Sequence, residues 1–334
     1  MTSLRLVASK EVEIPYMGIA KDCIVLIGIS LCLSIHSQTS TTSQKTDQQD
    51  EPRRTQRDDT IVHENNGSPT ATVFTYGRTP LQEAIIQINE EYGWTVSYED
   101  APTVNAAEIV DDNAEFRRSR PGFHPELQDG YSPNGQPFQS TFNEINEHRA
   151  DEEIVLEKLL LDYNASTNPG RYNLRRTPHG GYFVVGTSYT SESGLKAENT
   201  AILDCQISVT VTPTSLHDAL QLVADKVNDT CKNNLRAKLD GIFAGEWPMW
   251  PDEDDLYGTY RDQTARDVIL DLIDQEEYLL VYSVEYAPGL NVYYLETYPA
   301  SKKTVGVDGN QISEPIRNPK FISENFPFES GAGR

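Results

Sequence analysis

A pattern of strand, helix and strand occurs twice in this chain of 334 residues, and the repeat limits the folds that the chain can adopt. In the first copy, an alternating stretch over residues 72–76 precedes the helix-like segment TPLQEAIIQINEEYG and the strand-like WTVSYED. In the second copy, CQISVTVT precedes TSLHDALQLVADKVN. Leu81 aligns with Leu216 and Ala84 with Ala219, at one offset of 135 residues. Because internal repeats define architecture, two related modules are expected.

The apolar spacing of the two segments predicts helices. Leucines, isoleucines, valines and a tyrosine recur at i, i+4, i+7 and i+11 in both copies: Leu81, Ile85, Ile88 and Tyr92, then Leu216, Leu220, Val223 and Val227. Thr79 is expected to cap the first helix in a capping box with Gln82, and Pro80 suits the first helical position. Gly93 is expected to end it.

A second unit, a helix followed by a hairpin, is also repeated. The helix expected over residues 152–163 has the apolar face Val155, Leu156, Leu159 and Leu160, and the helix over 264–276 has Val268, Ile269, Leu272 and Ile273 at a constant offset of 113. Thr264 is expected to cap the later helix, with Asp267 three residues on. Hairpins are expected over residues 172–186 and 279–296.

Together these units predict an α+β protein with two tandem modules. Each module has the order β-α-β, long loop, α-β-β, with small mixed sheets and helices packed on one face. The first module spans residues 72–188 with its loop at 100–151, and the second spans 203–298 with its loop at 241–262.

TVFTYGRTPLQEAIIQINEEYGWTVSYED resembles the first half of the secretin and TonB short N-terminal domain, in which a strand and a helix with a Pro-Leu-x-x-Ala type start precede a second strand. TARDVILDLIDQEEYLLVYSVEYAPGLNVYYLE is similar to the second half of that domain, a helix and then a hairpin. The resemblance covers about two-thirds of the chain by this alignment and extends to uncharacterised secreted bacterial proteins of the same plan. It implies the fold, whereas no receptor barrel, plug or secretin ring follows.

The ends of the chain predict export. Residues 24–35, IVLIGISLCLSI, carry no charge and follow Lys21, and this length is typical of a signal-peptide core and short for a membrane anchor. Residues 1–37 are therefore expected to be a signal peptide, with Met1 or Met17 as the start, or a membrane anchor if uncleaved. Residues 38–71 are expected to be a disordered tether, and 299–334 a low-order tail. The mature protein is expected to be periplasmic or extracellular.

Charge excludes some partners. Lys plus Arg number 28 against 51 Asp plus Glu, a net charge of −23. This charge disfavours nucleic-acid binding, and it also disfavours docking on anionic lipid through a basic patch. Membrane contact is expected only through the signal segment.

The loop at 241–262 contains EWPMWPDEDDLYGTY, the candidate binding segment. Trp247 and Trp250 are expected either to plug the open end of the sheet or to anchor a carbohydrate or peptide partner. Its acids, Asp252, Asp254 and Asp255, would steer a cationic partner or hold a cation loosely, without the spacing of an EF-hand.

Known catalytic motifs are missing from the sequence, and no catalytic residue, metal ligand or cofactor is assigned. Ser193-Gly-Leu-Lys196 matches S-x-x-K without its partner motifs. Glu144, Glu147 and His148 lie close enough in sequence to share a metal, although such trios are common in acidic loops. Three sequons begin at Asn66, Asn164 and Asn228, relevant only in a eukaryotic secretory pathway.

Length matching predicts one disulfide. The strand from Cys205 to Thr212 extends about 23 Å at roughly 3.3 Å per residue. The helix from Ser215 to Thr230 returns over about 22 Å at 1.5 Å per residue, which would bring Cys231 beside Cys205. In an oxidising compartment these two cysteines are expected to bond; the alternative is two unrelated buried thiols.

The sequence thus favours an exported, non-enzymatic protein that binds or docks to a cell-envelope protein or glycan through its long loops. A cell-envelope hydrolase using loop carboxylates is the alternative, and it would need two carboxylates, or a histidine and a carboxylate, to converge in a cleft. A purely structural envelope component is the third possibility.

Overall fold

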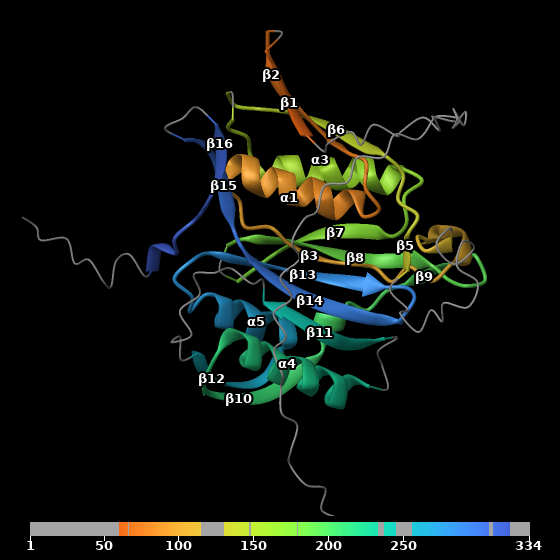
Figure 1. Cartoon of the computed structure of the whole chain (residues 1–334), viewed down its shortest axis with the longest axis vertical. Coiled ribbons are helices and arrows are strands. Elements are labelled where there is room, and N and C mark those ends of the chain that lie inside the picture. Colours follow the sequence, from red (N-terminus) through yellow and green to blue (C-terminus); the bar gives the residue numbers. More distant parts are fainter. Residues whose placement is uncertain are drawn as a thin grey trace, which may run out of the picture. The chain divides into compact units, whose positions relative to one another are not determined.

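The computed structural model describes residues 60–65, 67–114, 130–146, 148–178, 180–232, 237–244, 256–306 and 310–320 (Figure 1). The predicted signal peptide and the first part of the predicted tether lie outside these ranges. Within them, no helix has both the length and the apolar character needed to cross a membrane.

The α+β class is confirmed, and the elements of each predicted module occur in the predicted order. The first module contains β2 (Pro69–Thr75), α1 (Pro80–Tyr92), β3 (Ser97–Glu99), α3 (Glu152–Ala165), β7 (Arg171–Arg176) and β8 (Tyr182–Thr190). The second contains β10 (Gln206–Thr214), α4 (Leu216–Cys231), β11 (Lys238–Ala244), α5 (Ala265–Ile273), β13 (Leu280–Ala287) and β14 (Val292–Pro299).

The two long loops contain strands that the sequence analysis missed. In the first loop these are β4 (Ile109–Asp111), β5 (Tyr131–Pro133) and β6 (Phe138–Asn143), after the short helix η1 (Ala106–Glu108). In the second loop it is β12 (Leu256–Thr264). β6 pairs antiparallel with β2, and β12 with β10. Phe138 and Phe142 are buried on one side of β6, an alternation that the surrounding prolines and glycines obscured.

Two segments expected to lack structure also form strands. The predicted tether contains β1 (Thr60–Asn65), which pairs with β2. The predicted tail contains the hairpin of β15 (Ser301–Val305) and β16 (Gln311–Pro315), and β15 packs on α1. Between the modules lie β9 (Lys196–Glu198) and η2 (Ile202–Asp204).

The modules share one sheet, whereas separate small sheets were expected. Its seven strands follow the order β11-β14-β13-β3-β8-β7, with β9 also paired to β8. β11, β14 and β13 belong to the second module, and β3, β8 and β7 belong to the first. Parallel pairing of β13 with β3 joins the modules, through Ser283 opposite Tyr98 and Val284 opposite Glu99.

The two helices of each module lie on one face of that module's strands, as expected, and the two modules use opposite faces of the shared sheet. In Figure 1, α1 and α3 lie between one face and the strands β1, β2 and β6, whereas α4 and α5 lie between the other face and β10 and β12. The strand directions explain this arrangement. β11, β14 and β13 have the same order and relative directions as β3, β8 and β7, but the second set runs the opposite way along the sheet. Such a relation turns the second module over.

A buried ion pair lies at the joint between the modules. The Arg266 guanidinium at the start of α5 donates through Nε and Nη2 to the Glu99 carboxylate at the end of β3, with Nη2 to Oε2 at 2.7 Å. It also donates to Asp204 (2.5 Å), and the Tyr282 hydroxyl donates to Glu99 (2.8 Å). Arg266 stacks over the Phe183 ring at 4.4 Å.

The helix ends follow the sequence signals with one exception. Thr264 accepts from the Asp267 N–H at 3.1 Å, and Gly93 ends α1 with φ of 71°. The predicted capping box of Thr79 with Gln82 is wrong, because the Thr79 side chain makes no cap bond. Gln82 instead donates to Glu285 of the second module, so a tertiary contact displaces the local one.

Candidate metal centre

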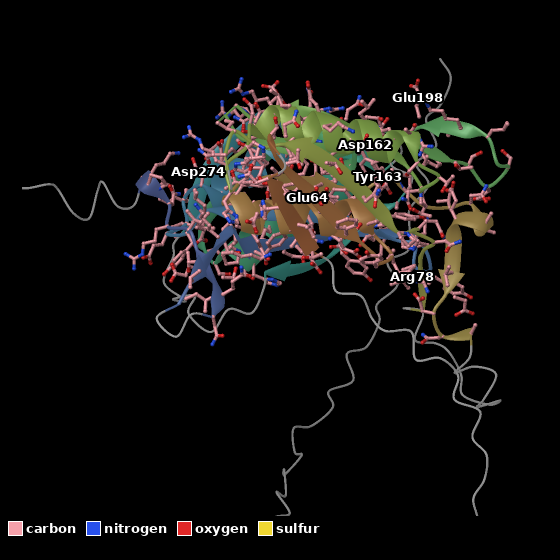
Figure 2. The ribbon with its side chains drawn as sticks, turned by 90° about the horizontal axis from the view of Figure 1, so that it is seen from above. Glu64, Arg78, Asp162, Tyr163, Glu198 and Asp274 are labelled. Carbon is pink, nitrogen blue, oxygen red and sulfur yellow. A yellow bond between two sulfur atoms is a disulfide. The ribbon has the colours of Figure 1, made fainter. Side chains whose placement is uncertain are left out.

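Two histidines and a glutamate from three separate elements converge beside the C-terminal end of α1. His63 comes from β1, Glu91 from the last turn of α1 and His148 from the turn between β6 and α3. On β1 the side chains alternate: Ile61 and His63 are partly buried, whereas Glu64 is exposed (Figure 2). The pairing of β1 with β2, which places His63 opposite Ala71, fixes this orientation.

The donor atoms of the three side chains lie close enough for one ion. Glu91 Oε1 is 3.1 Å from His63 Nε2 and 2.6 Å from His148 Nδ1. One ligand atom from each residue falls within 4.8 Å of the others, and the two imidazole rings are 4.3 Å apart between centroids. Bonds of about 2.0–2.2 Å to zinc place tetrahedral donors about 3.4 Å apart, so small side-chain movements suffice to complete the site.

A buried carboxylate stands behind the first histidine. Glu144 Oε2 lies 3.1 Å from His63 Nδ1, the ring nitrogen that faces away from Glu91. A carboxylate in this position fixes the orientation of a metal-binding imidazole and increases its basicity. The Glu144 side chain is only 1% exposed, so it would be costly to bury without these partners.

Three hydrogen bonds hold Glu144 in place. It accepts from the Tyr92 hydroxyl at 2.9 Å and from the His148 backbone N–H at 3.1 Å, in addition to the contact with His63. Burial, together with the hydrogen bond and charge of Glu144, raises the pKa of Tyr92, so its hydroxyl stays a neutral donor. Tyr92 is itself positioned by stacking on Trp94, with ring centroids 4.7 Å apart.

His148 has a backbone conformation that favours this geometry. Its φ of 61° lies in the left-handed region, which a residue other than glycine adopts uncommonly. The turn reverses the chain between Asn146 and Arg149, which form an isolated bridge. It directs the His148 N–H at Glu144 and its ring at Glu91, so one residue contacts both carboxylates.

The sequence analysis found only part of this centre. Of the trio Glu144, Glu147 and His148, the structure brings the first and last together, and Glu147 lies outside the described residues. The sequence analysis missed His63 and Glu91, which lie 81 and 53 positions before Glu144. The pairing of β1 with β2 brings His63 to both carboxylates. No local spacing encodes such a convergence. The only available signal was the two-residue spacing that places His63 on the same side of its strand as Ile61.

The other predicted binding residues cannot be placed in the same way. Trp247, Trp250, Asp252, Asp254 and Asp255 lie outside the described residues, so their binding role stays a prediction. Ser193 of the S-x-x-K match lies at an exposed turn, where its hydroxyl is 3.0 Å from that of Ser191.

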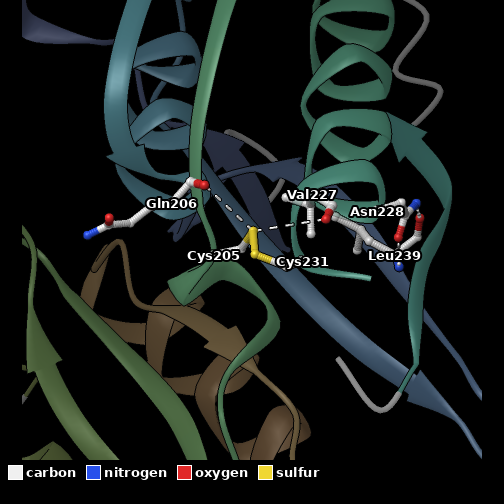
Figure 3. Close-up of a disulfide and its surroundings, with 6 residues drawn as sticks. All are labelled: Cys205, Gln206, Val227, Asn228, Cys231 and Leu239. Atoms are coloured by element: carbon white, nitrogen blue, oxygen red, sulfur yellow. Dashed lines mark hydrogen bonds between the residues drawn. A yellow bond between two sulfur atoms is a disulfide. The ribbon is translucent and has the colours of Figure 1, made fainter. Parts of the chain in front are cut away.

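The predicted cysteine pair is bonded. Cys205, directly before β10, and Cys231, at the end of α4, form a disulfide (Figure 3). Next to it, the Asn228 side chain accepts from the Leu239 N–H (2.9 Å) and donates to the Leu239 carbonyl (2.6 Å). Asn164 forms the same pair of hydrogen bonds with the backbone of Tyr172. The side-chain amides of both sequon residues, Asn164 and Asn228, are therefore used in hydrogen bonds within the fold.

Two cavities are described in the structure, and neither borders the metal-ligand cluster. One of about 340 Å³ is lined by residues including Val104, Glu192 and Tyr286, and one of about 160 Å³ by residues including Ser97 and Leu280.

Comparison with known proteins adds no family assignment. No protein-family model matches the chain, and neither a curated protein nor a solved structure shows significant similarity to it.

Proposed function

We propose that this chain is an exported binding protein that holds a divalent transition-metal ion between His63, His148 and Glu91. The observation that carries the proposal is the pairing of these three donors with a buried outer carboxylate, Glu144, on the far nitrogen of His63. Each of the four side chains has a role in ion binding.

The donor set favours zinc or a neighbouring first-row ion. Two imidazole nitrogens and one carboxylate oxygen suit Zn²⁺, Ni²⁺ or Cu²⁺, whereas Ca²⁺ and Mg²⁺ prefer oxygen ligands throughout. Three protein ligands leave one tetrahedral position for water or for a group from a partner. His148 is 56% exposed, so this position is reached from solvent.

Export is supported by the Cys205–Cys231 disulfide, since structural disulfides belong mainly to oxidising compartments. We also propose kinship of each module with the secretin and TonB short N-terminal domain; the strand and helix order supports it. A docking role for the loops in the cell envelope remains part of the proposal.

A metal-dependent hydrolase is the second candidate. Three protein ligands with an open position are the pattern of catalytic zinc sites, and the loop before α3 contributes both a histidine and a carboxylate to the centre.

The test is titration of the full-length, metal-free protein with Zn²⁺ by calorimetry and with Co²⁺ by absorption spectroscopy. One ion per chain is expected, with the visible bands of tetrahedral Co²⁺. His63→Ala and Glu91→Gln should abolish binding, and Glu144→Gln should weaken it about 10- to 100-fold. His217→Ala and Glu157→Gln, both exposed on other helices, are the matched controls.

Equal affinity in the ligand variants and the wild type would overturn the proposal. Metal-dependent hydrolysis of an activated ester, lost in His63→Ala but retained in His217→Ala, would favour the hydrolase instead.

A further inference from the structure

We propose that β7 and β11, the two end strands of the shared sheet, pair with each other between copies of this chain and join the copies head to tail. The inference rests on the way in which the two modules are joined inside one chain, and it is independent of the metal centre.

The internal joint shows how one module accepts the next. β13 of the second module pairs in parallel with β3 of the first, and the Asp100 N–H donates to the Val284 carbonyl at 2.8 Å. The Tyr282 N–H donates to the Ser97 hydroxyl at 3.2 Å. This joint therefore combines a short parallel ladder with side-chain bonds at its margin.

Each end of the sheet presents one half of the same joint. In the second module, β14 pairs in parallel with β11 and antiparallel with β13. In the first module, β8 likewise pairs in parallel with β3 and antiparallel with β7. β11 is thus the counterpart of β3, and β7 the counterpart of β13. The edge of β7 that corresponds to the joined edge of β13 is not paired to any other described strand.

The strand directions also match. Following the pairings along the sheet, β7 runs in the same direction as β11, and so a second copy placed beyond β7 presents its β11 in parallel orientation. The helices also continue to alternate between the two faces of the sheet. The second module of the added copy would follow the first module of the original copy, and these two modules carry their helices on opposite faces. Unlike a two-fold contact, such a joint can repeat without closing.

An asparagine from the preceding helix caps the outer edge of both end strands. Asn164 bonds the N–H and carbonyl of Tyr172 on β7, at 2.9 and 2.8 Å, and Asn228 does the same for Leu239 on β11. The internal joint contains this device too, since Asn89 caps Val96 directly before β3. On β11 the cap is therefore compatible with pairing at the residues that follow. On β7 it occupies Tyr172 alone and leaves the later outward positions to the incoming strand.

The outward backbone groups of β7 can be assigned by alternation. The Arg171 carbonyl accepts from Thr187, beside β8, whereas the Tyr172 groups face Asn164. The next outward positions are Leu174 and Arg176, the counterparts of Val284 and Tyr286 in β13. These positions would receive the incoming strand.

Charge supports a second copy as the occupant. The chain has a net charge of −23, yet β7, RYNLRR, carries three arginines and no acid, and of these three only Arg175 is ion-paired with an acid (Asp204) among the described residues. An acidic copy is attracted to this strand at short range, while two copies repel one another at long range. Added salt screens the long-range term first, so association should increase from low to moderate ionic strength.

The first test is sedimentation velocity of the full-length protein over a range of concentrations and salt. Concentration-dependent, open-ended association is expected. Arg176→Pro removes an outward N–H, a change that an edge strand tolerates, and Arg176→Ala removes the same charge but keeps the N–H. The proline variant should associate about fivefold more weakly than the alanine variant, as the loss of one hydrogen bond of about 1 kcal/mol implies.

The second test measures the register and does not depend on the proline variant folding. By the counterpart relation, Asn173 and Ile242 should face each other across the joint, as Ser283 and Tyr98 do inside the chain. A chain with Asn173→Cys is mixed with a chain with Ile242→Cys and treated with a short thiol cross-linker. Cys23 and Cys32 are replaced by serine in both.

Selective cross-linking of this pair supports the joint. The control replaces Asn173→Cys by Leu161→Cys, at a position on α3 that is 66% exposed. Equal yields from the two mixtures, or a monomer at every concentration and salt, would overturn the proposal.

Discussion

Arg266 of the second module forms a bidentate ion pair with Glu99 of the first, and both side chains are almost fully buried. Burial disfavours the charge on Arg266, but the Glu99 charge and hydrogen bonds outweigh it, and the pKa of Arg266 lies above its usual range. Two desolvated charges are thus balanced by one another, by their hydrogen bonds and by the partly exposed Asp204 carboxylate, across the joint on which the shared sheet depends.

Removing one partner of this pair should destabilise the protein strongly. Glu99→Gln leaves the buried guanidinium with Asp204, which is 30% exposed, as its remaining ion-pair partner, and the expected loss in the free energy of unfolding is about 3 kcal/mol. Urea denaturation measures it. Asp162→Asn, which breaks the partly exposed pair with Lys158, is the control and should cost about 1 kcal/mol or less. The double variant Glu99→Gln/Arg266→Met should recover part of the loss; a loss below that of the control would contradict this account.

Asp100, which follows β3, should make stability depend on pH. Burial raises the pKa of its carboxyl from 3.8 to about 6, although hydrogen bonds from Tyr172, Tyr98 and the Tyr286 N–H act in the opposite direction. The folded state therefore holds this proton more tightly than the unfolded state, and the resulting stabilisation is lost as pH increases from about 4 through 6. About 3 kcal/mol is expected from a shift of this size.

Asp100→Asn removes that titration. The difference in the free energy of unfolding between wild type and variant is measured by denaturation at each pH. It should fall by about 3 kcal/mol between pH 4 and 7. Any effect of the amide itself on stability is the same at every pH and does not change this fall. Asp225→Asn, at an exposed position on α4, controls for the loss of one charge. A difference that is independent of pH would show that Asp100 is not the responsible group.

The asparagine caps should each contribute to stability. Asn228→Ala leaves the Leu239 N–H and carbonyl without their partner, with an expected cost of about 1–3 kcal/mol, and Asn164→Ala should behave alike at Tyr172. Thermal or urea denaturation measures the change, with Asp229→Ala at an exposed position of α4 as the control. Costs no greater than that of the control would mean that water replaces the caps.

Reduction of the Cys205–Cys231 disulfide should lower stability by about 3.5 kcal/mol, because the bond closes a loop of about 27 residues in the unfolded chain. The measurement is denaturation with and without a thiol reductant. The double variant Cys205→Ala/Cys231→Ala should not respond to the reductant. Two titratable thiols at these positions in denatured, unreduced protein would show that the bond does not form in the cell.

The sequence by itself determined the parts of this protein that depend on neighbours along the chain. The apolar faces of α1 and α4, the cap at Thr264, the turn at Gly93 and the match in length between β10 and α4 that brings two cysteines together all follow from local periodicity and dimensions. The order of elements in both modules follows from the same patterns, because a helix or hairpin shows its buried face in its own residues.

Tertiary structure alone decided which edges meet. Nothing in the three residues of β3 shows that they pair with β13 on one side and β8 on the other, since backbone hydrogen bonds carry no residue code. The same applies to His63 and Glu91, which reach Glu144 and His148 only because β1 pairs with β2 and α1 packs beneath them. Contacts between distant segments depend on the packing of whole layers, and so the joint and the metal centre emerge only when the sheet is assembled.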